Sequence, residues 1–311
     1  MHTTINRVRL GALAALALGL GACSGSNSTT SPASPTTAPL SRADAQAVGE
    51  EMVNEMGDIA DRASMHDLMA PSFPVPWASE GFYHGPRFFT PTAGCPTLSP
   101  NPPTDADGDH VPDDLTITYD PSVCTFSSFH DHATLTLSGS LHIVDPSQTS
   151  PGVRLEFNAL QSKFTVDTVY WLRQIDGVWQ IVSSATGFSS SDTTTVTHQS
   201  SRFGTAQLVK QWQVDFTADQ GQTFGNDQAL PSGDFTVNGS TSRTASTHMR
   251  SFTVTTVTPL HYDATCMAAN RIVSGEMTLS TTTSNGTNTV DIVFNACGTD
   301  PTITLQTPPT T

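Results

Sequence analysis

Polar and apolar residues alternate along most of the chain after residue 114, and no other pattern in the sequence restricts the fold as strongly. The clearest example lies between residues 134 and 143, where leucines and an isoleucine alternate with threonine, serine and histidine. Successive side chains of a β-strand point to opposite faces, so such runs predict half-buried antiparallel strands over residues 115–306. We therefore expect a mainly β fold, an antiparallel β-meander that forms either a sandwich or an open barrel.

Three dipeptides in this region indicate tight turns: Asp176-Gly177, Asn238-Gly239 and Asn285-Gly286. Two-residue β-hairpins need positive φ at their central positions, and these residue types tolerate it. Each dipeptide is therefore predicted to join two neighbouring strands.

One segment before the strands has a helical pattern instead. From residue 41 to about residue 69, apolar residues recur every three or four positions, as on one face of an amphipathic helix. Ser41 followed by Asp44 is typical of a capped helix start, and Pro71 ends the pattern. A crossover rich in proline and aromatic residues, 71–104, leads to the acidic loop and the strands. We expect the helix to pack on the sheet, within a single domain that spans residues 41–311.

The N-terminus has the features of a bacterial export signal. Arg7 and Arg9 precede a short apolar stretch, and the run LGAC follows at residues 20–23. This run resembles the lipobox of bacterial lipoproteins, and the chain is similar to uncharacterised members of that class. The resemblance implies cleavage before Cys23 and lipidation of its thiol. Residues 23–40, which are rich in serine, threonine and proline, are then expected to form a lipidated tether.

Two other interpretations of residues 1–22 compete with a lipoprotein signal peptide. An uncleaved transmembrane helix needs about 20 apolar residues, and the apolar stretch here is shorter. A plain secretory signal without lipidation stays open as the alternative. If Cys23 is lipidated, the membrane becomes a partner through the lipid anchor. Ser24 stands where an aspartate retains Gram-negative lipoproteins at the inner membrane, so the resemblance implies the outer membrane in a Gram-negative source.

Net charge argues against nucleic acid as a partner. Removal of residues 1–22 takes away Arg7 and Arg9 and no acidic residue, so the formal net charge changes from −15 to −17. A strongly acidic surface repels phosphate groups.

The remaining cysteines predict two disulfides. With Cys23 lipidated, the other four form an even set in a chain exported to an oxidising compartment: Cys95, Cys124, Cys266 and Cys297. Three connectivities are open, and proximity in the sequence favours the first pair and the last pair. A redox-active pair is the weaker hypothesis, because neither pair has CxxC spacing.

Residues 105–114, with the sequence DADGDHVPDD, are the strongest indication of a metal site. Ca²⁺ prefers six to eight oxygen ligands, which closely spaced carboxylates on one loop provide. The run resembles the calcium loops of thrombospondin type 3 repeats. That resemblance implies side-chain ligands from Asp105, Asp107 and Asp109, a backbone carbonyl from Val111 and a further contact from Asp113. A structural Ca²⁺ ion is the expected cofactor, and a solvated acidic turn is the alternative.

A weaker metal hypothesis concerns His130 and His132, which would point to the same side of an extended chain, with His142 close by in the sequence. Two imidazoles suit zinc or copper, whereas polar-face histidines are the ordinary explanation. The sequence contains no GxSxG, no HExxH and no glycine-rich phosphate loop. Enzymatic activity therefore stays uncertain, and we expect no catalytic residues.

Three hypotheses about function follow from these patterns. The first is a non-catalytic, lipid-anchored protein of the cell envelope, which binds a partner or has a structural role at the cell surface or in the periplasm. The second is a carrier of lipid or another apolar molecule, because a helix followed by a long antiparallel sheet is similar in outline to the lipoprotein-localisation carriers. The third is a secreted hydrolase with an unrecognised site.

Overall fold

A computed structural model shows the arrangement of most of the chain after the tether. It describes residues 34–35, 39–63, 94–108, 111–127, 133–146, 152–202, 204–222, 230–245, 248–268, 270–283 and 285–308.

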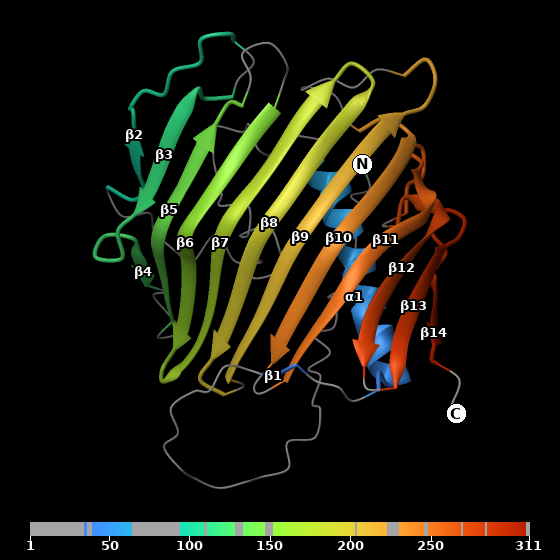
Figure 1. Cartoon of the computed structure of the whole chain (residues 1–311). Coiled ribbons are helices and arrows are strands. Elements are labelled where there is room, and N and C mark those ends of the chain that lie inside the picture. The colour runs from blue at the N-terminus through green and yellow to red at the C-terminus, as the bar shows by residue number, and fades with distance from the viewer. Residues whose placement is uncertain are drawn as a thin grey trace, which may run out of the picture. The chain divides into compact units, whose positions relative to one another are not determined.

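The described residues form one large β-sheet and one helix (Figure 1). The helix is α1 (Arg42–Ala63). The strands are β1 (Ser34–Pro35), β2 (Thr97–Ser99), β3 (Asp114–Tyr119), β4 (Thr125–Ser127), β5 (Ala133–Val144), β6 (Gly152–Val166), β7 (Val169–Ser184), β8 (Gly187–Ser200), β9 (Gly204–Ala218), β10 (Gly233–Ala245), β11 (His248–Tyr262), β12 (Ile272–Thr283), β13 (Gly286–Phe294) and β14 (Thr302–Gln306).

The sheet is an antiparallel meander, in which most strands pair with their neighbours in the sequence. Its order runs from β14 through consecutive strands to β5, then β3 and β2, while β4 pairs with β5 and the short β1 pairs in parallel with β11. Strands β14 and β2 end the sheet, so it does not close. The prediction of a mainly β meander with one N-terminal helix is confirmed, as an open sheet.

The two faces of the sheet differ as the alternation predicts. On the inner face, which α1 contacts, the odd-numbered residues of β5 such as Leu141 and Ile143 are buried, and so are Met277 and Leu279 of β12. Full burial of such a side chain contributes about 1.5–3 kcal/mol. The outer face carries mainly threonine, serine, glutamine and charged side chains.

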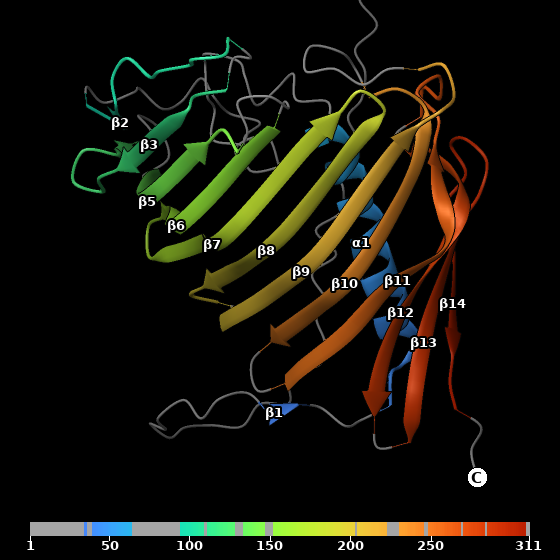
Figure 2. The same cartoon turned by 45° about the horizontal axis from the view of Figure 1, so that its top comes forward.

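Helix α1 lies against the inner face (Figures 1 and 2). The Asp44 backbone N–H donates to Ser41 Oγ at 3.1 Å, which is the capping contact that the sequence predicts. Met52 and Met56 of the apolar stripe are buried in the common core. Ile303 of β14 packs directly against Gly49 of α1. A Cβ atom at position 49 would lie 2.8 Å from Ile303 Cγ2, so this packing requires glycine.

Two of the predicted turns are wrong. Gly177 lies inside β7 and Gly239 lies inside β10, with φ of 118° and 145°. At each glycine, a Cβ atom would lie 2.2 Å or less from a carbonyl oxygen of the neighbouring strand, so glycine allows two backbones to approach. Only Asn285-Gly286 lies at a hairpin, where Thr283 pairs with Gly286 between β12 and β13.

Among the described residues, no helix has the length and the apolar character needed to cross a membrane.

Candidate functional site

Both disulfides lie at the ends of strands, near the two ends of the sheet. Cys95 bonds to Cys124 with an S–S distance of 2.05 Å, and Cys266 bonds to Cys297 with an S–S distance of 2.03 Å. This is the pairing that proximity in the sequence favours. One bond joins the segment before β2 to the turn after β3, and the other joins the turn after β11 to the segment before β14.

The two disulfide turns share a local design that sequence reasoning missed. In each, an aspartate follows a buried tyrosine at the strand end, and the hydroxyl and backbone N–H of the residue two positions later donate to its Oδ1 atom. These hydrogen bonds lower the pKa of Asp120 and of Asp263. The repeated sequence, Tyr-Asp followed by serine or threonine and then cysteine, was the available signal.

The described residues of the acidic loop, 105–108 and 111–114, are joined by hydrogen bonds between β2 and β3. Asp105 Oδ1 accepts the Gly108 N–H at 2.8 Å, and Asp113 Oδ1 accepts the Ala106 N–H at 3.1 Å. The Asp113 N–H in turn donates to the Thr104 carbonyl at 2.9 Å. Asp105 and Asp113, from opposite ends of the loop, therefore each accept a backbone N–H of the segment 106–108.

Several of the predicted site residues lie outside the described part of the chain: Cys23, Asp109, His130 and His132. Within the described residues, no group of three or more histidine, cysteine, aspartate or glutamate side chains is arranged to hold a metal ion. Asp109, the central ligand of the predicted calcium loop, lies outside these described residues.

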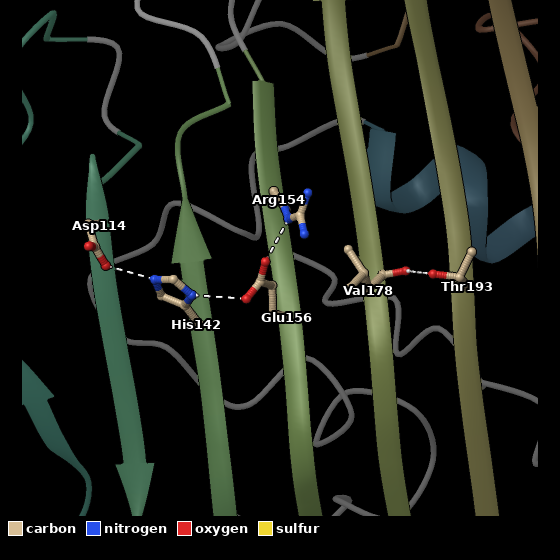
Figure 3. Close-up of polar contacts among 6 residues, drawn as sticks. All are labelled: Asp114, His142, Arg154, Glu156, Val178 and Thr193. Carbon is tan, nitrogen blue, oxygen red and sulfur yellow. Dashed lines mark hydrogen bonds and ion pairs between the residues drawn. The ribbon is translucent and has the colours of Figure 1, made fainter.

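A polar network begins where the acidic loop ends, and it crosses three strands of the outer face (Figure 3). His142 of β5 contacts a carboxylate on either side: Nε2 lies 2.7 Å from Asp114 Oδ1, and Nδ1 lies 3.1 Å from Glu156 Oε2. Arg154 Nε donates to the other oxygen of Glu156 at 2.7 Å. We call Asp114, His142, Glu156 and Arg154 the outer-face network.

The strand register brings these four residues together. His142 pairs with Glu156 across β5 and β6, while Asp114 and Arg154 both pair with Val144 from either side of β5. Because the side chains alternate, all four point away from the apolar core. The sequence placed His142 on a polar face, but it could not give the partners, since register between distant strands is not encoded locally.

The surroundings of His142 favour its charged form. Partial burial lowers its pKa, but the hydrogen bonds and charges of Asp114 and Glu156 outweigh burial, so the pKa is raised above 6.5. The hydrogen bond from His142, together with the contact from Arg154, lowers the pKa of Glu156 below 4.5. Below its raised pKa, His142 is therefore an imidazolium held between two carboxylates.

This arrangement suits structural cross-linking better than acid–base catalysis. Both ring nitrogens of His142 contact carboxylates, so neither is placed to take a proton from a nucleophile. The network instead joins β3, β5 and β6 beside the acidic loop.

No protein-family model, curated protein or solved structure matches this chain significantly. What the structure shows is a disulfide-bonded β-sheet domain, and its two disulfides indicate an oxidising, extracytoplasmic location.

Proposed function

We propose that this chain is a non-catalytic, lipid-anchored protein of the bacterial cell envelope, whose β domain binds a partner or has a structural role there. The observation that carries the proposal is the pair of disulfides, because stable disulfides are typical of exported proteins. The lipobox-like run that ends at Cys23 supplies the anchor, and the tether that follows separates the lipid from the sheet.

The anchor is tested by expressing the full chain and its Cys23→Ser variant in a bacterial host. Lipidation predicts that the wild-type chain fractionates with membranes and carries the mass of a diacylated N-terminus, while the variant is exported but soluble. Equal fractionation of the two chains, without added mass on the wild type, would overturn the lipid anchor and favour a plain secretory signal.

We further propose that Ca²⁺ stabilises the acidic loop. The proposal is supported by Asp105 and Asp113, which both accept a backbone N–H of the segment 106–108, and each carboxylate has a second oxygen atom. Bound calcium would supply positive charge among the four aspartates predicted as ligands, Asp105, Asp107, Asp109 and Asp113, which otherwise repel one another.

Calcium binding is tested by thermal unfolding with added CaCl₂ or a chelator. We expect the ion to raise Tm, with Asp107→Asn removing the effect. Asp300→Asn, an exposed acidic residue far along the chain, is the matched control and should keep the effect. A Tm that does not respond to calcium would refute this part of the proposal.

A second candidate is a carrier of lipid or another apolar molecule. It is favoured by a pocket between α1 and the open sheet, lined mainly by apolar side chains from the helix and from β9 to β11. Native mass spectrometry of the exported protein tests it: a retained lipid adduct would support the carrier, whereas a bare chain without affinity for lipid would leave the first proposal alone.

A further inference from the structure

Three basic residues lie side by side on the inner face beneath α1. They come from adjacent strands, and each faces an acidic residue of the helix: Lys210 with Glu55, Arg243 with Glu51, and Arg250 with Asp44. We call these the helix-docking ion pairs. The chain has only 13 lysine and arginine residues, and three of them, each paired with a carboxylate of α1, lie on this small area.

The three pairs differ in how easily another anion could reach them. Lys210 Nζ lies 2.5 Å from Glu55 Oε1, and their side chains are only 6% and 18% exposed. Arg243 Nη1 lies 2.9 Å from Glu51 Oε2, and these side chains are 42% and 38% exposed. The Arg243–Glu51 pair is therefore the accessible member of the helix-docking ion pairs, at the rim of the cluster.

A pocket lies directly beside this rim. Its polar lining consists of Arg243, Glu51, Glu55 and Thr241, and Glu55 is already paired with Lys210. Its apolar lining consists of Val48, Met52, Leu208, Trp212 and Phe252. The pocket has a volume of about 20 Å³, enough for one water molecule. The indole N–H of Trp212 is buried and donates to no acceptor in the described structure, so a polar group of a ligand would satisfy it.

We propose that the seam between α1 and β9–β11 binds an amphiphile with an anionic head. The head takes the place of Glu51 at Arg243, and the apolar chain packs against Met52, Leu208 and Phe252 as it widens the pocket. This proposal rests on the carrier function proposed above and names its ligand class. In the structure, the Glu51 carboxylate occupies the position that the head would take.

The charge of the site is what selects the head. A neutral head would leave Arg243 paired with Glu51 and would gain only the apolar contacts. A cationic head in the place of Glu51 would lie beside three basic residues and only two remaining carboxylates, Glu55 and Asp44. It would also leave Arg243 without a partner. An anion exchanges with the Glu51 carboxylate, so Arg243 keeps a partner throughout.

The test uses the full chain with Cys23→Ser, which lacks acyl chains of its own, and a fluorescent fatty acid as the probe. Arg243→Gln should weaken binding of the acid by about tenfold, the effect of losing about 1.4 kcal/mol. Arg154→Gln is the matched control, because Arg154 is also 42% exposed and ion-paired, but on the outer face. Glu51→Gln should tighten binding of the acid, because it removes the competing carboxylate.

The outcomes separate this inference from the carrier function itself. Equal binding of the acid and the matching neutral alcohol would refute the anionic site and leave the carrier intact. No binding of either probe, by the wild type or by Glu51→Gln, would refute both. Displacement of the probe by phosphatidylglycerol vesicles would assign the head to a phospholipid, and displacement by free fatty acid alone would assign it to a carboxylate.

Discussion

The two faces of the sheet each carry a charged network, and the networks differ in what they connect. The outer-face network joins β3, β5 and β6, which the backbone hydrogen bonds of the sheet already hold together. The helix-docking ion pairs join α1 to β9, β10 and β11. In the described residues, no backbone hydrogen bond connects α1 to these strands. Loss of an inner pair should therefore affect the placement of a whole element, while loss of an outer contact should have local effects.

The networks also differ in chemistry. The outer-face network contains His142, whose two carboxylate partners raise its pKa above the ordinary value of 6.5, whereas the inner pairs use lysine, arginine and carboxylates. The outer face should consequently respond to mild changes of pH. The inner face should respond to the loss of one partner.

The largest effect is expected from Lys210→Met. This change leaves Glu55 without its partner in a largely buried position, which typically costs about 3–5 kcal/mol. Chemical denaturation measures the loss. The double variant Lys210→Met with Glu55→Gln should recover most of the stability, because no buried charge stays unpaired. If the double variant were as unstable as the single one, the packing of Lys210 over the Trp212 ring would be the more important contribution.

Removal of the Cys95–Cys124 disulfide by alanine substitution at both positions should cost about 3–4 kcal/mol in the chain-entropy model. Hydrogen exchange should rise in β2 and β3, next to the outer-face network, while α1 keeps its protection. The matched comparison is the Cys266–Cys297 pair, which closes a loop of similar length, with sequence separations of 31 and 29. Its removal should instead expose β14. A change in α1 of equal size in both variants would contradict the separation of the two regions.

His142→Gln should lower stability within a limited pH window. The pKa of His142 is raised on folding, so its contribution to the free energy of unfolding is complete below pH 6.5. This contribution is lost as the pH rises through the folded-state pKa. The pKa of Glu156 is lowered on folding, so its contribution to the free energy of unfolding is present above pH 4.5. This contribution is lost as the pH falls through the folded-state pKa. The difference from wild type should therefore be largest between pH 4.5 and 6.5.

We expect about 1 kcal/mol or less from His142→Gln, as for other exposed networks. Urea denaturation across this range measures the difference. Thr304→Gln, which puts the same side chain on the outer face of β14, is the control and should show no such window. A difference that stays constant with pH would mean that His142 acts through packing alone.

The smallest effects are expected from Arg154→Gln and Arg243→Gln, at about 0.2–1 kcal/mol each. The two arginines have equal side-chain exposure, so the location of the effect is more informative than its size. Arg243→Gln should increase hydrogen exchange in the middle of α1, and Arg154→Gln should leave α1 unchanged. The same result in both variants would remove the distinction between the two faces.

The strands could be predicted because buried and exposed residues alternate within each segment, as in β5 and β13, and this pattern is visible in the local sequence. The start of α1 was predictable for the same reason, since its cap lies within four residues. The failed turns show the limit: Asp176-Gly177 has the chemistry of a hairpin, but glycine serves there to let β7 and β8 approach. The outer-face network could not be predicted, because it depends on register between strands separated by up to 28 residues.

The Cys266–Cys297 disulfide has a consequence for solubility. Strand β13 contains the run Val290 to Phe294, in which the residues that face inward are fully or almost fully buried. Strand β14 is its only neighbour on the edge side in the described structure, and the disulfide holds the chain just before β14 begins. If β14 came loose in a reducing compartment, β13 would become an apolar edge that other chains could pair with. The bond that indicates export therefore also protects the protein against aggregation.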